Sequence, residues 1–281
     1  MIQPRQQTLQ LQDKTTLGIT IFPAENSDTP ILIIYPAFGV KATYYQPFAQ
    51  KLSKKGITVV TTDLRGHGLS SVRPDAKNNY GFLAMINDLK AVSDYLKQEN
   101  STLKIYILGH SLGGQAASLA VAKYPNNFAG LAMIGSPNVY YKGWSGFHYY
   151  RRKIGLNLLP AIGQIVAVLP KFKIGGYYTT QKQIQEWGYT GQTGNYKVMG
   201  DDFDYEKAMT TVKIPVFAID IEGDLMAPKA AIKNLYQKFK RTSALTTLTL
   251  TKVATDPKLS HINWPRKATD VMVEAVRDWL N

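Results

Sequence analysis

The 281-residue sequence contains no cysteine, which excludes disulfides and thiolate metal sites. Acidic residues are also scarce, since 20 Asp and Glu stand against 33 Lys and Arg, for a formal net charge of +13. The basic residues are scattered, and no zinc-ligand pairs, RNP-like motif or basic heptad region accompanies them. We therefore expect a solvated cationic surface and no nucleic-acid partner.

Long hydrophobic runs are missing as well. No apolar run of signal-peptide length opens the chain, which favours a cytoplasmic protein. The longest apolar stretch, residues 154–170, is broken by prolines and is shorter than the roughly 20 residues that a membrane span needs. We expect no transmembrane segment, although this stretch fits peripheral contact with a membrane. The length suits one large α/β domain with an insertion, or two small domains.

Strand-like runs alternate with helical segments along most of the chain. Residues 7–12 and 16–22 predict an opening hairpin, and buried-type strands and helices follow in turn. Such alternation implies crossover connections, and hence a mostly parallel sheet with helices on both faces. It stops after about residue 137 and resumes near residue 213. We predict an α/β core made of residues 1–137 and 211–281, with residues 138–210 inserted as a cap.

One serine lies where a predicted strand becomes a helix within two or three residues. Residues 105–108 read as a buried strand and residues 116–122 as an alanine-rich helix, with Ser111 between them. Gly109 and Gly113 lie two positions either side, where a side chain would collide in so tight a turn. A serine raised above the sheet edge in this way is typical of a nucleophile. The alternative is a glycine-rich turn whose serine only caps the helix.

Four motifs together resemble the α/β-hydrolase superfamily over most of the chain. GHSLGG at 109–114 is similar to its nucleophile elbow, and TDLRGHGLS at 62–70 to the loop after the preceding strand. IPVFAIDIEGDLMAP at 214–228 resembles the acid-bearing strand and turn, and SHINWP at 260–265 the histidine loop. Nucleophile, acid and histidine follow in the superfamily's order. The resemblance implies an α/β-hydrolase fold, with a mostly parallel central sheet and an inserted helical cap.

The chain offers only four histidines as the general base. His67 precedes the serine in a tight loop, where packing is the expected role. His110 adjoins Ser111 in sequence and should point away from its hydroxyl, and His148 lies in the irregular insertion. Only His261 falls in a loop before the last helix, after a strand. We therefore expect His261 to be the general base and acid.

Two aspartates compete for the third position of the triad. Asp220 still belongs to the strand end, whereas Asp224 lies in the turn beyond it and matches the superfamily's acid position. Glu222 is a weaker third option. The expected role of Asp224 is to hold the imidazole in one tautomer and stabilise the imidazolium. The catalytic residues predicted from the sequence are therefore Ser111, Asp224 and His261.

An oxyanion hole requires two backbone donors beside the serine. One is the N–H of Leu112, at a helix N-terminus where negative charge is favoured. By position in the superfamily, the other is the N–H of Phe38, although this chain has Pro36 and Ala37 where many relatives have a His-Gly pair. The polar residues of the 62–70 loop are expected to brace the rim of the site rather than to act chemically.

The predicted cap is rich in aromatic and apolar side chains that suit a dry substrate pocket, although many of them should only pack the cap itself. The apolar members include Leu156, Leu158, Leu159, Ile162, Ile165, Val166, Val168 and Leu169. Basic residues 151–153 are available for an anionic head group. The substrate-binding candidates are Tyr140, Trp144, Phe147 and Arg151.

These features predict a serine hydrolase that cleaves a small-molecule carboxylic ester or thioester with a hydrophobic acyl or aromatic part. Its acyl-enzyme would form on Ser111, without a metal or cofactor, in a monomer or homodimer. An acyltransferase would use the same three residues and remains an alternative. So does a non-catalytic ligand-binding protein on a hydrolase scaffold, although a pure binder has no need of a triad.

Overall fold

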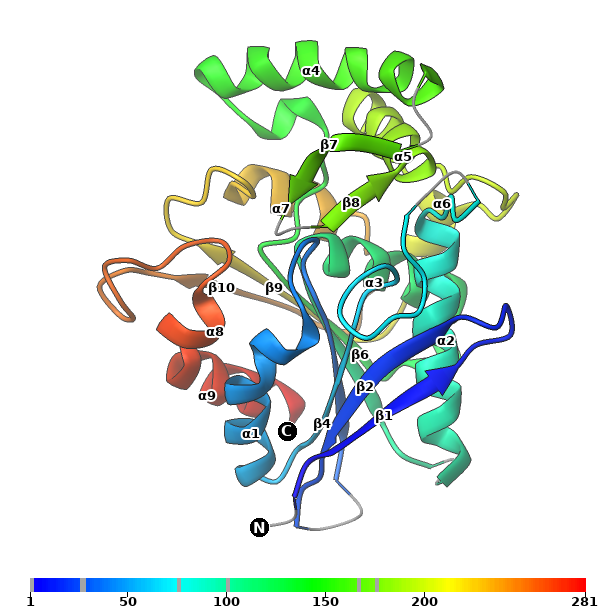
Figure 1. Cartoon of the computed structure of the whole chain (residues 1–281). Helices are drawn as coiled ribbons and strands as arrows, with labels where there is room; N and C mark the ends of the chain where they lie inside the picture. Colours follow the sequence, from blue (N-terminus) through cyan, green and yellow to red (C-terminus); the bar gives the residue numbers. More distant parts are fainter. Residues whose placement is uncertain (1–2, 26–28, 75–76, 100–101, 166–167, 175–176) are drawn as a thin grey trace.

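Eight strands form one twisted sheet in the computed structural model, which describes residues 3–25, 29–74, 77–99, 102–165, 168–174 and 177–281 (Figure 1). The strand order is β1-β2-β4-β3-β5-β6-β9-β10. The first two strands pair antiparallel as the predicted hairpin, β2 pairs antiparallel with β4, and every later pairing is parallel. The strands are β1 (Arg5–Gln10), β2 (Thr16–Phe22), β3 (Ile31–Tyr35), β4 (Thr58–Thr62), β5 (Ile105–His110), β6 (Gly130–Ile134), β9 (Val216–Ile221) and β10 (Leu245–Leu250).

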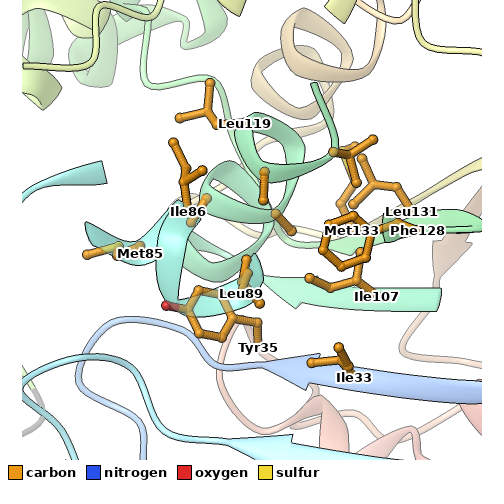
Figure 2. Close-up of a cluster of buried hydrophobic side chains, with 14 of the residues drawn as sticks. Ile33, Tyr35, Met85, Ile86, Leu89, Ile107, Leu119, Phe128, Leu131 and Met133 are labelled. Carbon is orange, nitrogen blue, oxygen red and sulfur yellow. The ribbon is translucent and has the colours of Figure 1, made fainter. Parts of the chain in front are cut away.

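Helices cover both faces of this sheet, because its parallel strands are apolar on both sides. One face packs against α2 (Phe82–Glu99), α3 (Leu112–Lys123) and α7 (Lys229–Tyr236). The other packs against α1 (Gln46–Lys54), α8 (Trp264–Lys267) and α9 (Thr269–Leu280). Figure 2 shows the first core, where side chains of α2 and α3 meet those of β3, β5 and β6. The mostly parallel sheet with helices on both faces is as predicted.

Residues between β6 and β9 build the elements that lie beyond one end of the sheet, at the top of Figure 1. A two-stranded antiparallel sheet, formed by residues 168–174 and 177–180, occurs there in addition to the expected helices. Short 3-10 helices, η1 (Ala42–Tyr45), η2 (Pro125–Asn127) and η3 (Tyr141–Gly143), complete the described chain. The elements of this segment are η3, α4 (Gly146–Ile165), β7 (Val168–Ile174), β8 (Tyr177–Thr180), α5 (Gln181–Thr193) and α6 (Tyr205–Met209).

Buried polar contacts attach α5 to the rest of the molecule. The Glu186 carboxylate accepts hydrogen bonds from the N–H of Phe82, at the start of α2, at 2.7 Å and from that of Met199 at 2.9 Å. Burial raises the pKa of Glu186 to about 7, against the lowering effect of these two bonds and of Lys182. The Thr180 hydroxyl, in the capping box of α5, also donates to the carbonyl of Tyr80.

No helix in the described segments is long and apolar enough to cross a membrane. Most of the predicted apolar stretch of the cap (Leu156, Leu159, Ile162, Ile165, Val166, Val168 and Leu169) falls on side chains outside the described part of the chain. Leu158 is described, and it is 55% exposed.

Candidate active site

Ser111 lies at the sharp turn between β5 and α3. Its backbone has φ 53° and ψ −116°, and Lys14 is the only other described non-glycine residue with positive φ. Such a conformation costs on the order of 1–3 kcal/mol and persists only where its surroundings enforce it. Here the Ser111 N–H donates to the carbonyl of Ile134 at 3.0 Å, while the Ser111 carbonyl accepts from the N–H of Gly114 at 3.0 Å. The turn is therefore held by β6 on one side and by α3 on the other.

The glycines of the GHSLGG motif are required by the close approach of neighbouring backbone. A Cβ on Gly109 would lie 2.4 Å from the Cα of Gly114, and one on Gly113 would lie 2.3 Å from the carbonyl oxygen of Tyr35. Backbone cannot move aside as the end of a flexible side chain can. These distances bear out the steric argument made from the sequence for both flanking glycines.

His261 and Asp224 meet near this turn, since the His261 ring centre lies 5.1 Å from that of His110, the residue before Ser111. His261 Nδ1 is 2.6 Å from Asp224 Oδ2, and both side chains are buried. The other carboxylate oxygen, Oδ1, accepts from the N–H groups of Met226 at 2.8 Å and Ala227 at 3.1 Å, which fixes the carboxylate. With Nδ1 facing a carboxylate, the neutral ring carries its proton there and presents Nε2 as an acceptor.

The Nε2 atom of His261 is buried and has no hydrogen-bond partner within the described residues. No hydrogen bond between it and the Ser111 hydroxyl is present among them either. Contacts between a nucleophile and its base are often long before substrate binds and tighten afterwards. The alternative acids point elsewhere: Asp220 Oδ2 accepts from the Thr249 hydroxyl at 3.0 Å, and Glu222 accepts from the Lys252 N–H at 2.7 Å.

In the tight turn of residues 37–40 after β3, the backbone N–H groups differ in whether they have a partner among the described residues. The N–H of Ala37 donates to Tyr45 Oη at 3.1 Å, that of Gly39 to His67 Nε2 at 2.9 Å, and that of Val40 to the carbonyl of Ala37 at 3.1 Å. The N–H of Phe38 has no partner in the described chain. The N–H groups of Ala37, Gly39 and Val40 are therefore hydrogen-bonded, whereas the N–H of Phe38, which we expect to face the oxyanion, is available to a ligand.

The N–H of Leu112 is likewise without a partner among the described residues. It belongs to the first residue of α3, whose N-terminal N–H groups have no acceptor within the helix. The two segments lie against each other, since a Cβ on Gly113 would be 2.4 Å from the carbonyl oxygen of Pro36. Two free donors, from the loop after β3 and from the start of α3, are what stabilisation of an oxyanion requires.

The remaining histidines occupy distinct environments. His67 accepts from Gly39 at Nε2 and donates from Nδ1 to the carbonyl of Arg65 at 3.1 Å, so both ring nitrogens are used. Burial lowers its pKa to about 4, which keeps it neutral near pH 7. Burial also lowers the pKa of His110 well below its usual value, and Nδ1 of that ring lies 2.7 Å from Tyr45 Oη. His148 is half-buried and stacks edge-on with Phe147.

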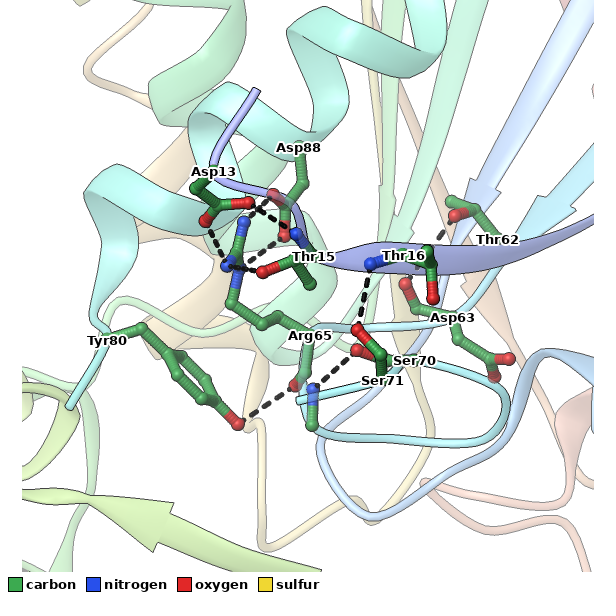
Figure 3. Close-up of polar contacts among 11 residues, drawn as sticks. Asp13, Thr15, Thr16, Thr62, Asp63, Arg65, Ser70, Ser71, Tyr80 and Asp88 are labelled. Carbon is green, nitrogen blue, oxygen red and sulfur yellow. Dashed lines mark hydrogen bonds and ion pairs between the residues drawn. The ribbon is translucent and has the colours of Figure 1, made fainter. Parts of the chain in front are cut away.

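The TDLRGHGLS loop braces the rim of the site, as Figure 3 shows for its polar contacts. The Arg65 guanidinium pairs with Asp88 at 2.5 Å and with Asp13 at 2.6 Å, which ties the loop to α2 and to the β1–β2 turn. Burial alone would lower the pKa of Arg65, but its two carboxylate partners raise it overall. The Asp63 carboxylate accepts from the N–H groups of Ala42 and Leu69, both at 2.9 Å. The charged groups of Arg65 and Asp63 therefore bind other residues of the protein.

The four predicted substrate contacts have different surroundings. Trp144 is buried, and its indole N–H donates to the carbonyl of Leu225 at 2.9 Å, next to Asp224. Tyr140 is half-buried and packs edge-on against Tyr141. In contrast, Phe147 is 75% exposed and Arg151 is exposed as well.

Sequence reasoning chose Arg151 from the basic residues 151–153 as a substrate-binding candidate and did not single out Arg152. Its guanidinium carbon lies 3.7 Å from the centre of the Trp144 ring, so it faces the body of the protein where its neighbour Arg151 does not. Helical periodicity would have separated the two positions, because adjacent residues differ by about 100° around a helix. In the described part of the chain, no cluster of three His, Asp or Glu side chains has the spacing to hold a metal ion.

Comparison with known proteins agrees with this geometry. The family described as "Serine aminopeptidase, S33" matches residues 27–173. The monoglyceride lipase of Rattus norvegicus is 28% identical over 110 residues, 38% of this chain and 36% of that protein. A probable alcohol acetyltransferase of Wickerhamomyces anomalus is 29% identical over 103 residues, 36% of this chain and 28% of that protein. The match to these curated relatives thus spans about a third of their length.

Solved structures match over nearly the whole chain. Est1E from Butyrivibrio proteoclasticus, in a structure with ferulic acid bound, superposes with a TM-score of 0.67 at 16% identity and covers 96% of each chain. This likeness confirms the α/β-hydrolase fold predicted from the sequence motifs. With more than half of its residues matched by the family and 96% of its length superposed on a solved structure, the chain belongs to the S33-like family of the α/β-hydrolase superfamily.

Proposed function

We propose that the protein is a serine hydrolase that cleaves a carboxylic ester through an acyl-enzyme on Ser111. One observation carries the proposal: a buried imidazole, His261, is held by Asp224 at 2.6 Å while its Nε2 is buried and unpartnered within the described residues. A buried polar atom without a partner costs free energy, so its persistence beside a strained serine supports a functional role. The family relationship supports the same reaction class.

The reaction proceeds in two balanced steps. Ser111 Oγ attacks the ester carbonyl carbon, its proton passes to His261 Nε2, and the carbonyl oxygen becomes an oxyanion facing the N–H groups of Phe38 and Leu112. When the oxyanion collapses, the C–O bond to the alcohol breaks and the alcohol leaves with the proton from Nε2. Water then attacks the acyl-enzyme, giving its proton to Nε2, and Ser111 regains that proton as the carboxylic acid departs.

The substrate class follows from the surroundings of the triad. Trp144 offers aromatic surface next to the acid loop, through its contact with Leu225, and this suits an apolar acyl or aromatic group. A thioester is attacked in the same way, with a thiol as the leaving group. The curated relatives include a monoglyceride lipase, which supports an ester of an apolar acid.

Acyl transfer is the second candidate, and the relationship to a probable alcohol acetyltransferase favours it. The same acyl-enzyme would be intercepted by an alcohol in place of water. The two reactions differ only in what reaches the acyl carbon in the second step. Partition of the acyl group between water and added alcohols therefore separates them.

A fluorophosphonate probe tests the proposal directly. We expect the probe to label Ser111 and to abolish hydrolysis of p-nitrophenyl butyrate, and we expect Ser111→Ala to lose both the label and the activity. Ser145→Ala, which removes an exposed hydroxyl from the same protein, is the control and should keep both. Folded wild-type protein that takes no label at Ser111 and cleaves no ester would contradict the proposal. A ligand-induced rise in Tm without labelling would favour the binding-protein alternative.

A further inference from the structure

Helix α4 turns one cation inward and leaves its neighbours in solvent. Arg151 and Lys153 are exposed, whereas Arg152 is half-buried. The helix also carries a stripe of exposed apolar side chains, Phe147, Tyr150, Ile154 and Leu158. At about 100° per residue, Arg152 lies about 140° around the helix from Phe147. It therefore occupies the face that looks toward the body of the protein.

The guanidinium of Arg152 lies next to the loop that carries Asp224. The Arg152 guanidinium stacks on the Trp144 ring with its central carbon 3.7 Å from the ring centre. The Trp144 indole N–H in turn donates to the carbonyl of Leu225 at 2.9 Å, and Leu225 directly follows Asp224. Stacking on an aromatic face and a fixed indole hold the planar guanidinium in one orientation. Arg152 is therefore a preorganised cation next to the proposed triad.

The guanidinium has no ion-pair or hydrogen-bond partner among the described residues. Arg65, the other inward-facing arginine of the site region, binds two carboxylates, and Arg277 binds two on the surface. Burial, with Arg151 nearby, lowers the pKa of Arg152 to about 10, while the charge of Asp224 acts the other way. A half-buried cation without an anion is costly, and its N–H groups are available to a ligand.

We propose that Arg152 binds a carboxylate of the substrate, so that the ester cleaved at Ser111 is an acidic one. This inference rests on the proposed function. A guanidinium pairs with a carboxylate through two parallel hydrogen bonds, and the single positive charge matches a single negative one. A phosphate dianion would call for a second inward cation, and the neighbours Arg151 and Lys153 point to solvent. The carboxylate lies on the substrate part that extends from the acyl carbon toward Trp144.

Two esters that differ in charge test the inference. Mono-p-nitrophenyl glutarate carries a terminal carboxylate, whereas p-nitrophenyl butyrate is neutral and otherwise similar. We expect the wild type to prefer the glutarate ester in kcat/KM. Arg152→Met should lower kcat/KM for that ester by on the order of 10- to 100-fold, the usual worth of a hydrogen bond to a charged group, and should lower kcat/KM for the neutral ester far less. Arg152→Lys should fall between, because it keeps the charge but loses the planar fork.

Arg241→Met is the control, since it removes the same charged side chain at an exposed position in the turn before β10. It should leave both esters unaffected. An equal loss on both esters in Arg152→Met, an equal effect of Arg241→Met, or no preference for the glutarate ester in the wild type would each overturn the inference.

A binding measurement separates this inference from the proposed reaction. In the Ser111→Ala background, free glutarate should raise Tm, and Arg152→Met should abolish that rise while Arg241→Met preserves it. Failure of Ser111 labelling would contradict the hydrolase, whatever glutarate does. Labelling of Ser111 and cleavage of neutral esters, without any effect of Arg152→Met on glutarate binding, would contradict the carboxylate site alone.

Discussion

The N–H of Gly39 donates to Nε2 of His67 at 2.9 Å, which connects the RGHG motif to the loop that carries the free N–H of Phe38. Nδ1 of the same ring is bound to the carbonyl of Arg65, and Tyr177 of β8 stacks on the ring with centroids 4.1 Å apart. The imidazole is therefore fixed on three sides. Its position determines where Gly39, and with it Phe38, can lie.

Loss of the acceptor at residue 67 should lower kcat with little change in KM. His67→Phe cannot accept from Gly39, so the loop is released and the oxyanion loses a well-placed donor. Loss of one such donor costs about 100- to 1,000-fold in kcat, and displacement of it should cost at least about tenfold. His67→Gln retains an acceptor near the place of Nε2 and should recover most of the rate. Steady-state kinetics on a p-nitrophenyl ester measure both, and equal kcat in the two variants would contradict the idea.

The contact between Asp224 and His261 predicts that replacement of the Asp224 carboxylate by an amide lowers kcat strongly. Asp224→Asn replaces the acceptor facing Nδ1 by an amide, which favours the tautomer with its proton on Nε2. That ring cannot accept the serine proton, so kcat should fall by about 1,000- to 10,000-fold. Asp220→Asn is the control, because Asp220 contacts Thr249 and not the imidazole. Comparable losses in the two variants would refute the assignment of the acid.

Two glycine-to-alanine substitutions should change the free energy of unfolding in opposite directions. Gly113→Ala places a Cβ 2.3 Å from the carbonyl oxygen of Tyr35, whereas Gly155, in α4, has nothing within 4 Å of an added Cβ. The first should destabilise the protein strongly, because two backbone segments must separate. Gly155→Ala should stabilise it by up to about 1 kcal/mol, the difference in helix propensity. Urea denaturation measures both free energies of unfolding, and a tolerated Gly113→Ala would show that the turn is not tightly packed.

Stability should depend on pH through Glu186. Its pKa is raised in the folded protein to about 7 from a usual value of 4.5. The folded state therefore binds the extra proton between these values, and the stability contribution present below pH 4.5 is lost as the pH rises through 7. Relative to the wild type, Glu186→Gln should have a flatter dependence of Tm on pH between about 5 and 7.5. Glu222→Gln, at an exposed carboxylate, should follow the wild type. Parallel Tm curves for Glu186→Gln and the wild type would contradict this assignment.

Local sequence determined the sheet, the elbow and the position of the candidate histidine loop. Apolar runs must be buried on both faces, and a serine between a strand and a helix needs small neighbours at 109 and 113 whatever the rest of the chain does. These are short-range requirements. For that reason the strand predicted at residues 105–108 is observed with the same start, as Ile105–His110.

Contacts between distant segments were decided by the tertiary structure alone. Asp220 and Asp224 lie four residues apart, and only the direction of each side chain from the end of β9 shows that Asp224 meets His261. Arg151 and Arg152 are chemically identical in the sequence, but the packing of α4 turns one to solvent and the other onto Trp144. Sequence patterns specify which residue types are present and how they repeat. Which side chains face each other depends on how elements far apart in the chain pack, and that is fixed only when the whole fold has formed.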